Sequence, residues 1–503
     1  MKQTIRWLPT HSRARAFFWL AFGLGASLRL IPLFHPMPAG DGLSRLCESI
    51  EWAYQPKWYG LGGQWPPLIM YLQGFLIRLG ADALWVAYGM GYLANVASLL
   101  LVYRLALVIT GNYATALWSL LACSVYWLHI TFVNTNFIED LYNLLLISFI
   151  LHVLKVAGQK NIRLLDMVTL SALMALMLLT RHEARLIWIV STIYLLWNRE
   201  YRVFWVVAAS GALVTAYLLT ENLLMRGSLL ADIESARRNF VVGAEIMGES
   251  STIGERLYPL LRWFLPYHPS IILIGAIVWG MYKSLCSKQA HFVILICGIP
   301  LIFILLSVFI SPLVPYPRYF LPIVVPAMAF AGVGLTAVPI RGAAPLLVAI
   351  AALIQSGQWY HSQSVKFGRY ELVNILPVQR LHPRQEVLRE FIVALPRNSR
   401  IYTLIAPRTS VNVSQIAVNM RRYDLVPFAS LHKYYDQYSA KLVIKKPTPE
   451  TFQQVDFVIV DRNHPDSQSV IQTVYRVGGK VVYERDSLIA FQVASDHDTN
   501  RFP

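Results

Sequence analysis

The sequence has few cysteines, few acidic residues and little charge of either sign for its length. Its 503 residues contain four cysteines, 28 acidic residues against 44 lysines and arginines, and 14% charged residues in all. The cysteines form no CxxC pair, which argues against a disulfide framework or a cysteine-based metal site. No GxGxxG or Walker-type loop is present, so nothing marks a nucleotide-binding domain.

Hydrophobic residues are abundant instead. They make up 56% of the chain, and the mean hydropathy is +0.47. A composition this apolar is typical of integral membrane proteins. The net charge of +16 would suggest nucleic acid in a soluble protein. Here many cations flank apolar segments, so we interpret them as setting membrane orientation and expect no nucleic-acid partner.

The apolar segments predict a polytopic α-helical membrane protein with about 11 transmembrane helices. The first, about residues 17–34, follows a basic tail, and Arg29 near its end favours an uncleaved span over a signal peptide. Basic residues at the inner turns predict a cytoplasmic N-terminus and an outer C-terminus. The lack of an ER-retention signal favours the plasma membrane of a prokaryote. Later spans include about 83–108, 113–129, 165–180, 203–219 and 292–310.

Two domains are expected. Residues 1–357 form the membrane domain, with outer loops 35–66 and 221–268, and residues 358–503 form a small extracytoplasmic domain. Alternating strands and helices predict that this second domain has an α/β fold. Its strands are expected at about 400–405, 456–461, 480–484 and 488–493, with a helix at about 385–395.

The first outer loop holds the most distinctive polar stretch. Asp41 lies between two glycines, which permit close approach of another molecule and unusual backbone angles. Arg45 follows one helical turn later, on the predicted polar face of a short amphipathic surface helix. A second surface helix is expected at about 66–79. The alternative for Asp41 is a helix cap in a solvated loop.

Other charged residues reach the same membrane face from distant loops. They are Lys57, Glu139, Asp140, Arg181, His182, Glu183, Arg237, Arg238 and Arg318, the last beside Tyr319. Each alone is readily explained as an interface anchor. Together they suit a reaction with one base and several phosphate-binding cations, because a carboxylate can deprotonate a hydroxyl and arginines hold phosphate.

Residues 15–357 resemble the GT-C membrane glycosyltransferases, in the family 39 and 83 branch of protein O-mannosyltransferases and lipid A aminoarabinose transferases. The resemblance rests on Gly40-Asp41-Gly42 with Arg45, Trp65-Pro66-Pro67-Leu68, Glu139-Asp140 and Pro317-Arg318-Tyr319. Two positions depart from the family pattern. Relatives often have a second acid where Gly42 stands, and a lysine where Trp65 stands.

The resemblance implies an inverting transfer of a sugar from a polyprenyl-phosphate donor to a hydroxyl of a protein, lipid or glycan. Asp41 would be the base, and Glu139 or Asp140 would orient the acceptor or a cation. The donor phosphate would be bound by Arg45, Lys57, Arg318 and Tyr319. Two or three carboxylates alone bind Mg²⁺ or Mn²⁺ weakly, so the sequence does not require a metal.

Two other classes of protein stay open. A transporter or lipid flippase should carry ionisable residues in the middle of its spans and broken helices in repeated halves. Here the acids lie mainly at span ends. A non-catalytic assembly or sensor protein would have no need of a carboxylate held between glycines.

Overall fold

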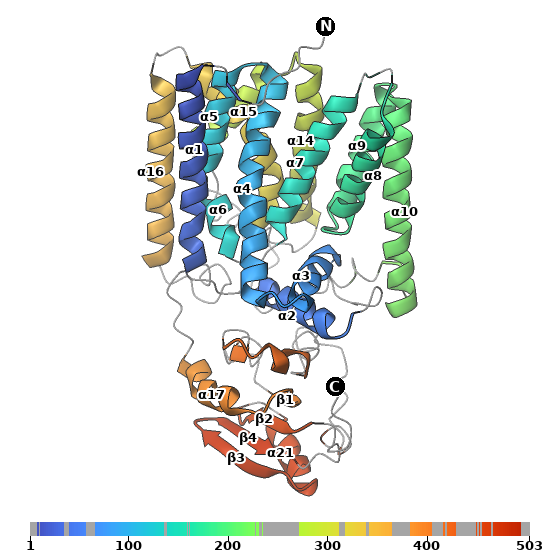
Figure 1. Ribbon diagram of the computed structural model, residues 1–503, viewed down its shortest axis with the longest axis vertical. Coiled ribbons are helices and arrows are strands. Elements are labelled where there is room, and N and C mark those ends of the chain that lie inside the picture. The colour runs from blue at the N-terminus through green and yellow to red at the C-terminus, as the bar shows by residue number, and fades with distance from the viewer. Residues whose placement is uncertain are drawn as a thin grey trace. The chain divides into compact units, whose positions relative to one another are not determined.

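A computed structural model gives the arrangement of most of the chain (Figure 1). It describes residues 8–9, 11–34, 40–56, 66–134, 138–157, 159, 161–226, 228–230, 234, 271–310, 317–338, 342–364, 383–404, 416–417, 420–428, 449, 452, 455–463 and 466–493. The chain divides into two compact units. The first comprises residues 1–42, 57–69 and 87–377, and the second residues 43–56, 70–86 and 378–503.

The first unit is helical. Its helices are α1 (Ser12–Leu30), α4 (Ala83–Thr110), α5 (Tyr113–Ser124), α6 (Trp127–Thr131), α7 (Glu139–Val156), α8 (Leu164–Leu178), α9 (Ala184–Trp197), α10 (Tyr201–Arg226), α13 (Ile271–Lys283), α14 (Lys288–Ile310), α15 (Leu321–Thr336) and α16 (Ala343–Ser364). Short 3₁₀ turns occur at η1 (Ile31–Phe34), η2 (Phe132–Asn134) and η3 (Pro317–Phe320).

Three helices in the described part of the chain are long and apolar enough to cross a membrane, namely Ala83–Thr110, Tyr201–Leu224 and Lys288–Leu306. The helices α1 and α7 have 19 and 18 residues but carry three ionisable residues or more each. Other apolar helices are shorter, such as α8 and α15. The structure thus confirms a mostly helical protein with apolar helices, and the count of 11 spans stays a prediction.

The predicted span at 113–129 is interrupted. Helix α5 ends at Ser124, and α6 begins at Trp127. The carbonyl oxygens of Cys123 and Ser124 accept hydrogen bonds from the guanidinium of Arg29 on α1. These are among the last carbonyls of the helix, which have no partner within it, so a cation from another helix satisfies the end of α5.

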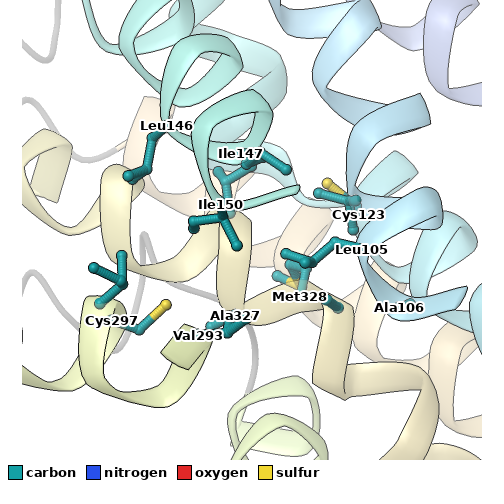
Figure 2. Close-up of a cluster of buried hydrophobic side chains, with 14 of the residues drawn as sticks. Leu105, Ala106, Cys123, Leu146, Ile147, Ile150, Val293, Cys297, Ala327 and Met328 are labelled. Carbon is teal, nitrogen blue, oxygen red and sulfur yellow. The ribbon is translucent and has the colours of Figure 1, made fainter. Parts of the chain in front are cut away.

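The core of the first unit lies where α4, α5, α7, α14 and α15 meet. Figure 2 shows buried side chains from these helices in one cluster, among them Leu105, Ala106, Cys123, Leu146, Ile147, Ile150, Val293, Cys297, Ala327 and Met328. Small residues bring two of the helices close. A Cβ on Gly332 of α15 would clash with the Thr115 carbonyl oxygen of α5, and Ser119 Oγ donates to the Ala329 carbonyl at 2.9 Å.

The two short helices expected from the sequence are α2 (Gly40–Tyr54) and α3 (Leu68–Arg78). The second unit contains α2 from residue 43 onward and α3 from residue 70 onward. They pack closely, because a Cβ on Gly74 would lie 2.8 Å from the Ser49 carbonyl oxygen. The predicted polar face of α2 is wrong at Arg45, which is 1% exposed. Periodicity alone placed Arg45 opposite the apolar residues, whereas packing around α2 covers that side as well.

The second unit also holds a four-stranded sheet in the order β1-β2-β4-β3, formed by β1 (Ile401–Leu404), β2 (Phe457–Asp461), β3 (Lys480–Arg485) and β4 (Leu488–Gln492). β1 and β2 are parallel, and the other pairs are antiparallel. α21 (Ser467–Arg476) covers one face through Val470 and Val474. α17 (Pro383–Ala394) reaches the other face, where Phe391 contacts Phe457. The four strands and α17 lie where the sequence predicts them.

A polar contact joins the 3₁₀ turn η5 (Tyr423–Phe428) to the residue that caps α4 within the second unit. Asp82 Oδ1 accepts from the Trp85 backbone N–H at 3.1 Å, as a helix cap does. Its other oxygen accepts from the Tyr423 hydroxyl at 3.0 Å and lies 3.5 Å from Arg421 Nε. Burial and the Asp82 carboxylate raise the pKa of Tyr423 above its usual value, so this hydroxyl keeps its proton.

Candidate active site

Glu139, the first residue of α7, belongs to a buried ionic cluster. Arg181 Nη1 donates to Glu139 Oε1 at 2.5 Å, and these side chains are 5% and 2% exposed. The other side of the same guanidinium donates twice to Glu183, from Nε at 3.1 Å and from Nη2 at 2.5 Å. Arg181 thus holds two carboxylates, one buried and one that is 46% exposed. The cluster carries one more negative than positive charge.

Aromatic rings flank the Arg181 guanidinium. Its central carbon lies 5.9 Å from the ring centre of Tyr142 on α7 and 5.8 Å from that of Tyr319 in η3. Both distances are within the range of a cation–π contact. The Pro317-Arg318-Tyr319 turn is therefore tied through Arg181 to Glu139, at the start of α7. Two segments that the sequence selects independently lie together for this reason.

A second buried cluster surrounds Arg29, which is fully buried near the end of α1. All five N–H groups of its guanidinium have an acceptor, the complete donor set of an arginine. Nε donates to Asn95 Oδ1, and Nη1 donates to the carbonyls of Gly25 at 2.9 Å and Ser124 at 3.1 Å. Nη2 donates to the Cys123 carbonyl at 3.1 Å and to His129 Nδ1 at 2.9 Å. None of the acceptors is a carboxylate.

Asp140 lies on the far side of Asn95 and His129 from Arg29. The Asn95 amide accepts from Arg29 and donates from Nδ2 to Asp140 Oδ1 at 2.7 Å and to the His129 carbonyl at 2.6 Å. His129 Nε2 lies 3.8 Å from the same oxygen. Because an arginine only donates, Nδ1 of His129 must accept, and the ring proton is then on Nε2, facing Asp140.

The adjacent acids Glu139 and Asp140 therefore face different partners. Successive residues of an α-helix are rotated by about 100°, so neighbours in sequence point to different sides. Glu139 pairs with Arg181, whereas Asp140 contacts Asn95 and His129. They do not form one paired-carboxylate site.

The structure describes the other predicted site residues less fully. Asp41 lies in the first turn of α2 and Arg318 in η3, but their side chains lie outside the described set, as does the whole of Lys57. The backbone at residues 40–42 is helical, so the glycines beside Asp41 do not adopt the unusual backbone angles that they permit. The helix begins at Gly40, three residues before Leu43, the first residue of its apolar pattern, and Asp41 is placed where a carboxylate is favoured by the helix dipole.

Among the described residues, no group of three or more His, Cys, Asp and Glu side chains is placed to share a metal ion. Glu139 Oε1 already pairs with Arg181, and Asp140 Oδ1 accepts from Asn95. The residues that the structure describes do not fit a divalent cation by themselves.

Comparison with solved structures settles the fold. ArnT from Cupriavidus metallidurans aligns over 95% of this chain and 98% of its own, at 13% identity and a TM-score of 0.59 in its apo state. The same protein bound to undecaprenyl phosphate gives 12% identity and a TM-score of 0.58 over the same shares. The Archaeoglobus fulgidus oligosaccharyltransferase tethered with an acceptor peptide aligns at 10% identity and a TM-score of 0.52, over 97% of this chain and 74% of its own.

The chain has the fold of ArnT. The similarity is of structure alone, because no protein-family model and no curated protein matches the sequence.

Within this fold, the sequence did not indicate three residues that the structure brings to Asp140. In the sequence, Arg29 served only as an argument against signal cleavage and His129 only marked the end of a predicted span. Asn95 was not identified. The available signal was polar side chains inside apolar segments, which mark functional positions in membranes. Arg181 and Glu183 were recognised as outer charges, but their pairing with Glu139 was not.

Proposed function

We propose that the protein is a glycosyltransferase that moves a sugar from a polyprenyl-phosphate carrier to an acceptor hydroxyl at the extracytoplasmic membrane face. The fold is that of ArnT, one structure of which is bound to undecaprenyl phosphate. In this proposal the chain crosses the membrane about eleven times, its N-terminus is cytoplasmic and residues 358–503 form an extracytoplasmic domain. The acceptor is a protein, a lipid or a glycan.

One observation in this chain carries the proposal beyond fold similarity. Arg181 ties the turn that contains Arg318 and Tyr319 to Glu139 at the start of α7. The turn that contains the proposed phosphate-binding residues and the first residue of α7 thereby share contacts with Arg181, although about 180 residues separate them in sequence. This is the combination that transfer from a sugar phosphate needs.

The proposed step is a single displacement at the anomeric carbon. The acceptor oxygen forms a bond to that carbon while its proton passes to Asp41 acting as general base. The bond between the anomeric carbon and the phosphate oxygen breaks, and the electron pair leaves on the polyprenyl phosphate. Cations from Arg45, Lys57 and Arg318 stabilise the developing charge, with Tyr319 beside them. Glu139 and Asp140 orient the acceptor.

The transporter alternative draws support from one observation, the buried ionisable group at Arg29. Its guanidinium, however, has all five donors occupied by protein acceptors within the described structure. It has no donor left to offer a cargo. This favours a fixed structural or positioning role over a place on a transport path.

The purified full-length protein, supplied with labelled polyprenyl-phosphate sugars and cell-envelope acceptors, should release polyprenyl phosphate and label one acceptor. Cells without the protein should accumulate a polyprenyl-phosphate sugar and lack one glycan residue. Accumulation of neither the lipid-linked sugar nor the unmodified acceptor would contradict the proposal.

Arg318 provides a test of donor recognition. A guanidinium binds phosphate through two parallel hydrogen bonds, whereas lysine offers only a point charge. We expect weaker donor binding in Arg318→Lys and a larger loss in Arg318→Ala, measured as donor KM. Equal KM values in the wild type and both variants would assign Arg318 to structure alone.

A further inference from the structure

The cluster at the ends of α1, α5 and α6 holds a buried arginine and a buried carboxyl group, and all five Arg29 donors go to acceptors other than Asp140. Arg29 and Asp140 are 0% and 1% exposed, and no hydrogen bond joins them directly. Asn95 connects them by accepting from Arg29 and donating to Asp140. His129 accepts from Arg29 at Nδ1 and faces Asp140 with Nε2. Asn95 thus links Arg29 to Asp140 through hydrogen bonds, and His129 lies beside this link with its Nε2 3.8 Å from Asp140 Oδ1.

Three backbone carbonyls hold the Arg29 guanidinium in place. Cys123 and Ser124 are the last two residues of α5, and their carbonyls are at the negative end of that helix. Gly25 supplies a third carbonyl from α1 itself. A Cβ on Gly25 would lie 2.5 Å from Ser124 Oγ, so the two helices are in close contact there. Arg29 is held by rigid backbone and has no freedom to follow a substrate.

From this geometry we infer that Arg29, Asn95 and His129 are positioning residues that set the orientation of the Asp140 carboxylate for sugar transfer. The inference rests on the proposed function, in which Asp140 takes part in orienting the acceptor. Asn95 Nδ2 takes one lone pair of Asp140 Oδ1, and His129 Nε2–H faces that same oxygen. Fixing one oxygen from a rigid framework determines the direction of the other.

Asn95 is itself held in a defined orientation. Its Oδ1 must accept, because the arginine only donates, and its Nδ2 donates to both Asp140 and the His129 carbonyl. A reversed amide would set a donor against Arg29 and an acceptor against Asp140. The order of donors and acceptors therefore runs in one direction, from Arg29 to Asp140.

The inference makes a distinction between two substitutions of His129. Glutamine retains both functions, because its amide oxygen can accept from Arg29 and its NH₂ can donate to Asp140. Phenylalanine fills similar space but has neither group. We expect His129→Phe to lower kcat by about 10- to 100-fold, the usual cost of losing support behind a reacting group, with donor KM nearly unchanged. We expect His129→Gln to stay within about threefold of the wild type.

A double-substitution cycle separates positioning from general structural damage. If His129 acts through Asp140, then His129→Phe should have no further effect on kcat in an Asp140→Asn background. His152, on the inner half of α7, is a matched control, because its ring contacts the Asp166 carbonyl and not this cluster. His152→Phe should leave kcat unchanged. All variants are compared as purified, folded full-length protein.

Each outcome decides a different claim. Normal kcat in His129→Phe, an additive loss in the double variant, or no rescue by glutamine would overturn the positioning role while leaving the proposed function in place. Normal turnover in Asp140→Asn would remove Asp140 from the reaction and the inference with it. No transfer by the wild type from any polyprenyl-phosphate sugar would overturn the proposed function itself.

A second measurement does not depend on activity. In ¹⁵N-histidine-labelled protein, the resonances of His129 are identified by their loss in His129→Gln. They should report a neutral ring with its proton on Nε2. A ring protonated on Nδ1 or on both nitrogens would overturn the hydrogen-bond order on which the inference depends.

Discussion

Replacing Arg181 with methionine would test the ionic cluster at the start of α7. Methionine has a similar length but no charge and no hydrogen-bond donor. It leaves Glu139, 2% exposed, without the cation that it pairs with. Removing one partner of a buried ion pair typically costs about 3–5 kcal/mol, because the other charge stays buried and uncompensated.

The other contacts of Arg181 contribute less. Glu183 is 46% exposed, so water can solvate it once the arginine is gone, and its share is about 1 kcal/mol or less. The two ring contacts, at 5.9 and 5.8 Å, are near the outer limit for cation–π pairs and add about 0.5–1 kcal/mol each. We therefore expect Arg181→Met to lose about 4–8 kcal/mol, most of it from Glu139.

The assay is the apparent melting temperature of the purified protein, followed by tryptophan fluorescence, for which the chain offers 14 tryptophans. A loss of this size should lower the melting temperature by about 5–10 °C for a chain of this length. All variants need the same heating rate, since large proteins often unfold irreversibly. The matched control is Glu183→Gln, which should shift the temperature little.

The decisive comparison is the double variant Arg181→Met with Glu139→Gln. It removes the buried negative charge that is left without a partner in the single variant, so it should be more stable than Arg181→Met alone. If the double variant is less stable than the single, or if Glu183→Gln costs as much as Arg181→Met, the buried pair is not the source of the effect.

Four further predictions concern other sites. Asp41→Asn should lower transfer by about 10²–10⁴-fold with donor binding retained, because Asn cannot accept the proton; near-native turnover would indicate a helix cap instead. Asn143→Leu should stabilise the protein by about 1–3 kcal/mol in a melting assay, because the fully buried Asn143 amide has no hydrogen-bond partner among the residues that the structure describes; a lower melting temperature would contradict this. Gly332→Ala should destabilise the protein by about 1–3 kcal/mol in the same assay, because the added methyl meets the α5 backbone; an unchanged melting temperature would contradict the close packing. Burial raises the pKa of Asp424, but hydrogen bonds from Arg422 and from backbone N–H groups outweigh it and hold that pKa below its usual value. The stabilisation is then present above the unfolded-state pKa of about 4 and lost as pH falls through the lower folded pKa. Asp424→Asn should therefore be less stable at pH 7, and in acid unfolding its deficit should disappear as pH falls through that folded pKa; an equal deficit at every pH would contradict this.

Much of the helical fold was predictable because its cause is local. A run of apolar residues such as 83–108 has few ways to bury itself other than as a long helix, and α4 covers Ala83–Thr110. The strands at β2 and β4 were likewise marked by short apolar runs between turn residues. The predictions were wrong about where one helix ends and about which face of another helix is buried. Residues 113–129 had no local signal for a break, and Arg45 had none for burial.

The candidate site was predictable only in part. The sequence by itself determined that acids and arginines occur at the ends of apolar helices, and it singled out Glu139 and Asp140 as a pair. It treated them as equivalent, because adjacent residues share a chemical type and a position. The helix rotates them apart, and only the neighbours then distinguish them, Arg181 for one and Asn95 for the other.

Arg29 shows what only the tertiary structure decided. The sequence determined its presence near the end of the first apolar helix, and therefore that a charge had to be accommodated there. Its five acceptors come from α1, α4, α5 and α6, and three of them are backbone carbonyls, which have no signature in the side-chain sequence. A buried charge takes its role from the groups that surround it, and those groups are assembled only when the helices pack.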